Sequence, residues 1–315
     1  MQSAQAKRLI TDLTSTRQIC LPSVYSQAQS VNSVSKVSQM FRFLVKWAKF
    51  LLAWIMKPEN WALKRTWIGA AILLRCAYVL MNEYGKNPFK KSLAKDHVFL
   101  TGAGSGIGRL MAIEFGKLGC KLSLSDINMA GLNETKAILM KEGVSAANIN
   151  IFVCDVSKKS QIKAGAQVAR AAFGPVTLLV NNAGIVSGKT TLELSEGMIE
   201  KTMQVNTIAL LHTIQEFLPD MITGKRGHIV TIASMAGLTS VPGLSDYCAS
   251  KHGAVAVDES VRLELQKKGL SKFIKTTCVC PYFINTGMFD GAKKAWPFYI
   301  LSPTETVDRI IAAIR

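Results

Sequence analysis

Short apolar runs alternate with longer segments of helical periodicity from residue 97 to the end of the chain. The runs are five to eight residues long and rich in Val, Ile, Leu and Phe, which is typical of buried strands. They span 97–101, 121–126, 149–155, 176–181, 228–233 and 273–280. Helical patterns lie between them, at about 158–173, 194–218 and 245–268. Six strands joined by crossover helices predict an α/β fold, in which a doubly wound parallel sheet is covered on both faces.

The last segment of the chain begins with Ser-Pro-Thr-Glu at 302–305. A Ser followed three residues later by a Glu predicts a capping box, and Pro suits the first position of a helix. We therefore expect a helix that starts after Ser302 and reaches Arg315.

The first 96 residues have a different pattern. Residues 1–36 are rich in Ser and Gln and lack apolar periodicity, which predicts a disordered leader, with a mitochondrial transit peptide as the alternative. Two apolar segments follow, at 38–56 and 61–81, and each carries its basic residues on a narrow part of the helical surface. Their longest uncharged run is nine residues, which is short for a bilayer span.

Two basic, apolar helices around the proline turn at 57–60 predict a hairpin that lies in one membrane leaflet. We interpret residues 37–96 as a membrane-anchor region, although a hairpin packed on the domain itself is an alternative. Four tryptophans would lie at the interface, and four lysines would follow as a basic cluster: Trp47, Trp54, Trp61, Trp67, Lys86, Lys90, Lys91 and Lys95.

Charge and cysteine content narrow the choice of partner and compartment. The net charge is +17, and residues 1–96 hold 15 Lys/Arg against 4 Asp/Glu, a balance of +11. Aromatic and apolar residues between these charges favour a lipid surface over nucleic acid. The seven cysteines include no C-x-x-C pair, and the sequence has no H-E-x-x-H, so we expect reduced thiols and no metal site.

A glycine-rich turn follows the first strand of the sheet. Gly102, Gly106 and Gly108 stand between that strand and a helix, where glycines let the backbone approach a pyrophosphate at the helix N-terminus. Asp126 ends the next strand, and a carboxylate there can bind the adenosine ribose and repel a 2′-phosphate. The pattern predicts a dinucleotide site that favours NAD over NADP.

Tyr247 and Lys251 lie four residues apart in a helical segment and so share one face. An ammonium beside a phenol favours the phenolate, which would bring the tyrosine pKa from about 10 toward the working range. Ser234, thirteen residues before the tyrosine, could donate a hydrogen bond to a substrate oxygen as charge develops there.

These motifs together make the chain similar to the short-chain dehydrogenase/reductase family over about residues 97–315. The resemblance is carried by TGAGSGIG at 101–108, Asp126, CDV at 154–156, NNAG at 181–184, Asn206, Ser234 and YCASK at 247–251. It implies a Rossmann fold and hydride transfer. It also implies that Tyr247 is the general acid and base, and that Ser234 stabilises the substrate oxygen.

The same resemblance assigns the remaining site residues. Lys251 would bind ribose and lower the pKa of Tyr247, and Asn206 would hold a water for proton relay. Asp155 and Val156 would flank adenine, and Asn181 would support the cofactor. The full set of cofactor-binding residues that we expect is Gly102, Ser105, Gly106, Ile107, Gly108, Asp126, Asp155, Val156, Asn182, Ala183, Gly184, Tyr247, Lys251, Pro281, Ile284 and Thr286.

A finer resemblance is to the membrane and lipid-droplet branch of the family, which includes retinol and hydroxysteroid dehydrogenases. Two departures stand out. Pro281-Tyr282 replaces the Pro-Gly of many relatives, and the family's seventh strand has no counterpart after the last helix. The resemblance also implies a possible homodimer.

We therefore expect an NAD- or NADP-dependent oxidation of a lipophilic alcohol to its carbonyl, at the endoplasmic reticulum membrane or a lipid droplet. Segment 287–301 would form an apolar lid over the substrate. The alternative is a catalytically idle membrane or lipid-droplet coat protein built on the same fold. Binding of NAD would separate the two, because an idle coat has no need of a dinucleotide.

Overall fold

The computed structural model describes residues 18–20, 75, 91–288 and 300–315. The chain forms two compact units, one of residues 1–23 and 92–315 and the other of residues 24–91. Only the first is described below, because the predicted anchor hairpin lies outside the described residues except for Arg75. Among the described residues, no helix combines the length and the apolar character needed to cross a membrane.

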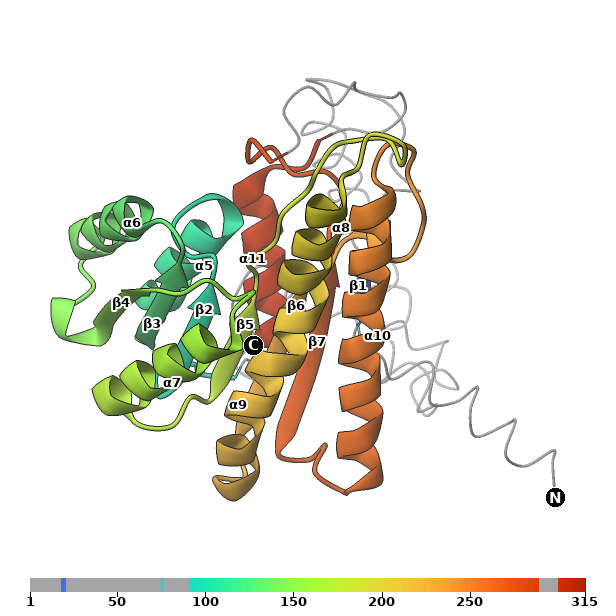
Figure 1. Cartoon of the computed structure of the whole chain (residues 1–315). Helices are drawn as coiled ribbons and strands as arrows, with labels where there is room; N and C mark the ends of the chain where they lie inside the picture. Colours follow the sequence, from blue (N-terminus) through green and yellow to red (C-terminus); the bar gives the residue numbers. More distant parts are fainter. Residues whose placement is uncertain (1–17, 21–74, 76–90, 289–299) are drawn as a thin grey trace, which may run out of the picture. The chain divides into compact units, whose positions relative to one another are not determined.

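The centre of the first unit is a parallel sheet in the order β1-β7-β6-β5-β2-β3-β4 (Figure 1). Its strands are β1 (Gln18–Cys20), β2 (His97–Thr101), β3 (Lys121–Asp126), β4 (Ile149–Val153), β5 (Leu178–Asn181), β6 (Gly227–Ile232) and β7 (Ile274–Cys280). From β2 the chain builds outward to β4 and then returns to build β5, β6 and β7 on the other side. The switch point therefore lies between β2 and β5, where open α/β sheets bind ligands at the carboxyl ends of their strands.

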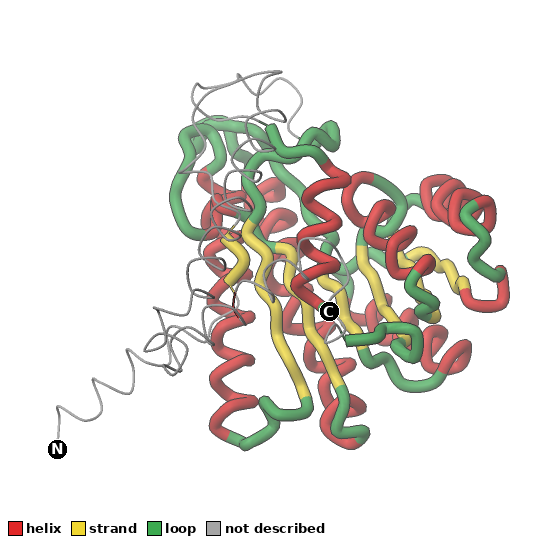
Figure 2. The backbone as a smooth tube through the Cα atoms, turned by 180° about the vertical axis from the view of Figure 1, so that it is seen from behind, coloured by secondary structure: helices red, strands yellow, loops and turns green. Residues whose placement is uncertain are grey.

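Helices cover both faces of the sheet (Figures 1 and 2). The two largest apolar clusters of the described residues lie between the sheet and these helices, one on each face. One face carries α5 (Gly106–Lys117), α6 (Met129–Lys141) and α11 (Pro303–Ile314), which contribute residues such as Phe115, Leu139 and Ile310. The other face carries α7 (Lys159–Phe173), α9 (Ala209–Thr223) and α10 (Ser245–Lys267), where Phe217 packs on Phe99. The predicted doubly wound α/β fold is thus confirmed.

Two buried faces explain why the strands were readable as apolar runs. All five residues of β2 are buried, and so are all six of β6. The predicted bounds of β2 and β3 match the structure, whereas β4 ends at Val153, two residues earlier than expected. Cys154 and Asp155, which follow β4, line the cavity described below.

The sheet gains a strand that the sequence did not predict. Gln18–Cys20 form β1, which pairs in parallel with β7 through Gln18↔Cys278 and Cys20↔Cys280. These residues fall in the stretch expected to be a disordered leader, and that expectation is wrong for them. The physical reason is the outer edge of β7, whose backbone groups need partners. After β7, the described chain contains no further strand, as expected.

The segment predicted as one helix at about 194–218 is interrupted. It consists of α8 (Glu196–Met203), a π-helical turn η4 (Gln204–Ile208) and then α9. The sequence gives no sign of this π-turn, because the apolar periodicity of the helix continues through it. Such turns are often found at functional sites, and this one carries Asn206.

The predicted capping box at 302–305 is wrong, although α11 begins there. Ser302 is the N-cap residue with Pro303 after it, but its side chain makes no capping hydrogen bond. Glu305 pairs instead with Arg309, one turn further along, at 2.7 Å. The Ser302 carbonyl accepts a hydrogen bond from the Thr306 hydroxyl at 2.8 Å.

Candidate active site

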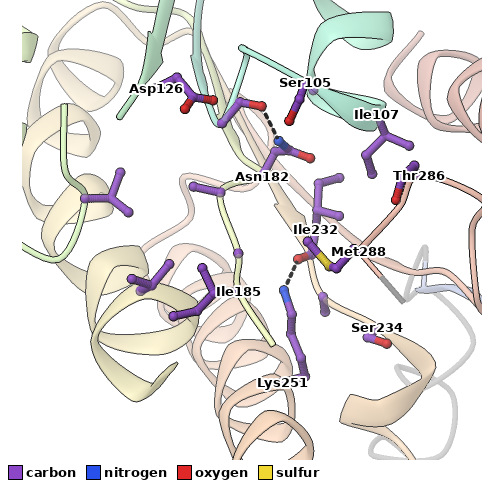
Figure 3. Close-up of a pocket in the computed structure, with 18 of the residues that line it drawn as sticks. Ser105, Ile107, Asp126, Asn182, Ile185, Ile232, Ser234, Lys251, Thr286 and Met288 are labelled. Atoms are coloured by element: carbon purple, nitrogen blue, oxygen red, sulfur yellow. Dashed lines mark hydrogen bonds between the residues drawn. The ribbon is translucent and has the colours of Figure 1, made fainter. Parts of the chain in front are cut away.

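A cavity of about 430 Å³ opens at the carboxyl ends of β2, β5 and β6, at the switch point. Every residue that we expected to bind the cofactor lies on its wall, together with Ser234. Figure 3 shows how the labelled side chains converge from the glycine turn, from β6 and from α10. The cavity thus brings together residues that are more than 180 positions apart in the sequence, from Gly102 to Thr286.

The glycine turn has the conformation that its sequence requires. Gly102 and Gly106 have positive φ angles of 68° and 53°, which side chains rarely tolerate. Gly108 packs directly on the backbone of Gly102, so that a Cβ at this position would overlap the Gly102 carbonyl oxygen. Asn182 holds the turn from β5, because its amide nitrogen donates to the carbonyls of Thr101 at 2.9 Å and Gly102 at 3.1 Å (Figure 3).

The start of α5 fits an anionic group such as a pyrophosphate. Its N-cap residue, Ser105, makes no side-chain capping bond, and the first turn contains no acidic residue. The first-turn N–H groups of this helix therefore have neither a side-chain cap nor a competing carboxylate. Ser105, Gly106 and Ile107 line the cavity. A helix N-terminus in this state is suited to bind the phosphates of a dinucleotide.

Asp126 is held in place at the end of β3 by two backbone amides. Its Oδ2 accepts from the Gly104 N–H at 2.9 Å, and its Oδ1 accepts from the Asn128 N–H at 3.0 Å. The carboxylate lines the cavity beside Ile127. It is thereby oriented where a ribose hydroxyl could donate to it, and its charge would oppose a phosphate at the same place.

The part of the cavity around Asp155, which we expected to flank adenine, contains an ion pair that sequence reasoning missed. Lys201 of α8 binds Asp155 Oδ2 at 3.1 Å and the Ser157 hydroxyl at 2.7 Å. Ser157 in turn donates to Asp155 Oδ1, and these contacts hold the pKa of Asp155 below its usual value against the effect of burial. Lys201 lies on the cavity wall, but a lone lysine on a helix face gives no signal in a sequence.

Tyr247 and Ser234 meet at the other end of the cavity. Ser234 comes from the segment after β6 and Tyr247 from the first turn of α10, and the two are close enough for the Ser234 hydroxyl to act on the Tyr247 pKa. Tyr247 is only 4% exposed. Burial raises the pKa of Tyr247 to about 12, although its hydrogen bond with Ser234 acts in the opposite direction.

Lys251 lies one turn after Tyr247 and faces the same cavity. Its ammonium donates to the Ile232 carbonyl at 2.9 Å and lies 5.7 Å from the centre of the Tyr247 ring (Figure 3). Burial lowers the pKa of Lys251 to about 8, and the group is therefore charged at neutral pH. Burial thus raises the Tyr247 pKa, and the group that acts against burial is Ser234; a lowering of this pKa by Lys251 stays a prediction.

Asn206 lies behind the cavity wall and links three parts of the site. Its Oδ1 accepts from the Ile185 N–H at 2.9 Å, and its amide donates to the Ile185 carbonyl and to the Ser250 hydroxyl. Ser250 donates onward to the Tyr247 carbonyl at 2.8 Å. The side chain of Asn206 therefore holds the 184–186 segment against α10.

Asn181 does not lie where we expected. It is 3% exposed, and its Oδ1 accepts from the Thr213 hydroxyl of α9 at 2.8 Å, on the face away from the cavity. The neighbouring residue, Asn182, supports the glycine turn instead. Adjacent residues of a strand point to opposite faces, and the sequence alone does not say which of two asparagines faces the ligand.

A buried carboxylate next to the tyrosine was also missed. Asp246 Oδ2 accepts from the Ser187 hydroxyl at 2.6 Å and from the Thr202 hydroxyl at 2.9 Å. These contacts join the segment after β5, the helix α8 and the first turn of α10. The predicted lid at 287–301 lies largely outside the described residues, but Met288 near its start lines the cavity, as does Tyr282 before it.

Comparison with known proteins places this chain in a family. The family model for short chain dehydrogenases matches residues 96–296. The chain belongs to the short chain dehydrogenase family and is an oxidoreductase by that membership.

Its relatives narrow the branch. The human epidermal retinol dehydrogenase 2 is 44% identical over 229 residues, which is 71% of this chain and 72% of that protein. The human estradiol 17-beta-dehydrogenase 11 is 42% identical over 225 residues, or 71% and 73%. The chain is therefore a homologue of retinol and hydroxysteroid dehydrogenases. The predicted alternative of an idle coat protein finds no support in these relatives.

Solved structures share the fold and hold nicotinamide cofactors. A short chain dehydrogenase/reductase from Burkholderia phymatum in complex with NAD has a TM-score of 0.65 and 30% identity, covering 71% of this chain and 87% of that one. A metagenomic short-chain oxidoreductase in complex with NADP has a TM-score of 0.59 and 28% identity, covering 71% and 93%. A nicotinamide cofactor is therefore supported for this fold, in either phosphorylation state.

Proposed function

We propose that this protein oxidises a lipophilic alcohol to its aldehyde or ketone with a nicotinamide cofactor. One observation carries the proposal: Tyr247 and Ser234 line the same cavity as the glycine turn and Asp126, and Ser234 is close enough to Tyr247 to affect its pKa. A phenol that can transfer a proton therefore lines the same cavity as the residues suited to bind a dinucleotide. The cofactor, when bound, supplies the acceptor for the hydride from the alcohol carbon.

The residues of the chain would manage the proton. The alcohol hydroxyl would donate its proton to the Tyr247 oxygen while the Ser234 hydroxyl donates a hydrogen bond to the same substrate oxygen. Because burial holds the phenol in its neutral form, Tyr247 must first release its own proton to water in the cavity, which carries it to the solvent. The Lys251 ammonium, 5.7 Å from the ring, favours that release as long as it is charged.

In the reverse direction, the reduction of a carbonyl, Tyr247 need not lose its proton first. A neutral phenol with a pKa of about 12 is a proton donor at physiological pH, and it could protonate the oxygen of a carbonyl substrate directly. We therefore propose that oxidation becomes faster as the pH rises from neutral toward the pKa of Lys251, about 8, whereas reduction does not.

We further propose NAD as the preferred cofactor, although solved relatives hold either form. The support is Asp126, whose side chain two backbone amides hold in place on the cavity wall. No lysine or arginine stands within the glycine turn to balance a 2′-phosphate, and Arg109, just after the turn, is paired with Glu134 at 2.7 Å.

The lipophilic character of the substrate, and a membrane or lipid-droplet surface as the place of action, are proposals from the relatives and the sequence. The relatives are named for retinol and estradiol, which are both apolar alcohols. Partly exposed apolar residues line the substrate end of the cavity, including Ile185, Tyr282 and Met288. The apolar and basic segments at 38–81 would hold the chain at the endoplasmic reticulum membrane or a droplet.

The test is the production of NADH from retinol, hydroxysteroids and long-chain alcohols by the full chain and by Tyr247→Phe. Removing the phenolic oxygen should lower kcat by about 10²–10⁴, the usual contribution of general acid–base catalysis. The phenylalanine keeps the buried ring, so the melting temperature and the affinity for NAD should change little. Undiminished turnover by the variant would refute the proposed proton transfer.

A further inference from the structure

Basic residues gather at the end of the sheet opposite the cavity. They lie just before or at the amino ends of β2, β3, β6 and β7, and the lower ends of α9, α10 and β7 in Figure 1 belong to this edge. We call this set the basic edge; it consists of Lys95, Lys121, Lys225, Arg226, Lys267, Lys268, Lys272 and Lys275, all of which are exposed. The two loops that carry most of it lie side by side, because the Gly227 N–H donates to the Phe273 carbonyl at 3.2 Å.

Few carboxylates oppose this charge. Asp96 is buried and binds Arg226 at 2.9 Å, which leaves the seven lysines. None of these lysines forms an ion pair with a carboxylate of the described residues, in contrast to Arg109, Arg170 and Lys201 elsewhere on the domain. Unpaired cations on one edge raise the local positive potential, and they cost stability through mutual repulsion unless an anionic partner is present.

An aromatic ring lies among these cations. Phe273, in the loop between α10 and β7, is half-buried and has the ammonium of Lys272 at 4.9 Å and that of Lys225 at 5.7 Å from its ring centre. Lys225 is the one non-glycine residue with positive φ in the described chain, at 47°, which turns the loop beside this ring. An apolar ring surrounded by amines is the composition found where proteins meet the headgroup layer of a membrane.

The chain also enters the domain at this edge. Residues 92–96 lead into β2, and Asp96 connects them to Arg226 of the basic edge. These five residues are the end of the predicted membrane-anchor region at 37–96. Lys95 belongs to both that region and the basic edge, whereas the cavity lies about 20 Å away at the far ends of the strands, at ~3.3 Å per residue.

We propose that the basic edge docks on the surface of a membrane that contains anionic phospholipids. Phosphate headgroups would pair with the lysines, and Phe273 would lie at the boundary of the acyl chains. The mouth of the cavity would then face away from the docked surface, and a lipophilic substrate would have to leave the bilayer before it reaches Tyr247. This inference rests on the membrane association proposed above and is independent of the chemistry proposed for the cavity.

The test is hydrogen exchange of the full chain on vesicles of phosphatidylcholine alone and of phosphatidylcholine mixed with phosphatidylserine. The variant replaces Lys225, Lys267, Lys268 and Lys272 with Gln. The matched control replaces four exposed lysines of the opposite half with Gln: Lys158, Lys159, Lys163 and Lys189. A third arm replaces the vesicles by a soluble RNA.

On mixed vesicles, exchange should slow in peptides 222–228 and 265–276 and not in peptides 187–197 and 235–245. The protection should be lost in the basic-edge variant, kept in the control, and absent on neutral vesicles. Protection around the cavity mouth instead, equal protection on neutral vesicles, or protection by RNA alone would overturn the proposal. Binding to neutral vesicles tests the proposed membrane anchor alone. The test therefore distinguishes a wrong proposal about the anchor from a wrong proposal about the basic edge.

Discussion

Burial, more than any single neighbour, sets the ionisation of the residues around the cavity. It raises the pKa of Tyr247 to about 12 and lowers that of Lys251 to about 8, so that each charged form is disfavoured. At neutral pH the pair is a phenol beside an ammonium. The site without a ligand is therefore prepared to give a proton, and accepting one requires additional positive charge.

Asp258 shows the same effect behind the catalytic helix. It is 5% exposed, and burial raises its pKa to about 6 although the Thr231 hydroxyl donates to it at 2.9 Å. A raised pKa in the folded state means that the carboxyl stabilises the fold when it is neutral. This contribution is present below the unfolded pKa of about 3.9 and is lost as the pH rises through about 6.

Asp258→Asn should therefore stabilise the protein at neutral pH, since the amide can still accept from Thr231 and need not ionise. The pKa shift corresponds to a gain of up to about 3 kcal/mol above pH 6, which should shrink toward zero near pH 4. Thermal melts of the variant between pH 4 and 8 measure it. Asp308→Asn, at an exposed position of α11, is the control. A gain that does not depend on pH would contradict this account.

Asp126 tests the cofactor preference at the same scale. Asp126→Ser removes the charge that opposes a 2′-phosphate while a hydroxyl remains to interact with the Gly104 amide. We expect the ratio of kcat/KM for NADP to that for NAD to rise by at least about tenfold, the equivalent of ~1.4 kcal/mol. Steady-state kinetics with both cofactors gives the ratio, and an unchanged ratio would mean that Asp126 does not select between them.

At the scale of elements, the site depends on side chains that tie one segment to another. Asp246 joins α8, α10 and the segment after β5, whereas Asn206 joins that segment to Ser250. In α10, Asp246 directly precedes Tyr247, and Ser250 follows it by three residues. The position of the phenol is thus set by contacts that never touch a substrate.

Asp246→Ala should destabilise the protein by about 1–3 kcal/mol, because the Ser187 and Thr202 hydroxyls lose their acceptor in a buried place. It should also lower kcat more than it raises KM for NAD, since Tyr247 moves and the glycine turn does not. Asp246→Asn keeps an acceptor for both hydroxyls and is the control. Equal damage from both variants would point to the charge of Asp246 and not to its hydrogen bonds.

Sequence patterns predicted these elements to different degrees. β2 could be placed to the residue because its centre is a run of apolar residues, and β3 because leucines alternate with small serines that are also buried. The motif residues on the cavity wall were also predictable, since most stand near a strand end or in the glycine turn, and Tyr247 and Lys251 share one face of α10. The π-turn, the tie at Asp246 and the Lys201–Asp155 pair could not be, because they depend on which distant side chains come together.

At the scale of the molecule, catalysis and docking are assigned to opposite ends of one sheet. The basic-edge variant should therefore oxidise a short, water-soluble alcohol with an unchanged kcat/KM. With substrate supplied in anionic vesicles, any change in rate would then come from docking alone. NADH production in both settings measures this. A loss of activity toward the soluble alcohol would show that the two ends are coupled.

The π-turn between α8 and α9 has a consequence for how this chain can vary in length. Because η4 holds one residue more than an α-helical turn, it advances the register of everything after it by about 100°. Deleting a single residue between Gln204 and Ile208 would restore an uninterrupted helix and swing Phe217 away from Phe99. Asn206 would lose Ser250 at the same time, so this stretch should tolerate substitution far better than a change in its count of residues.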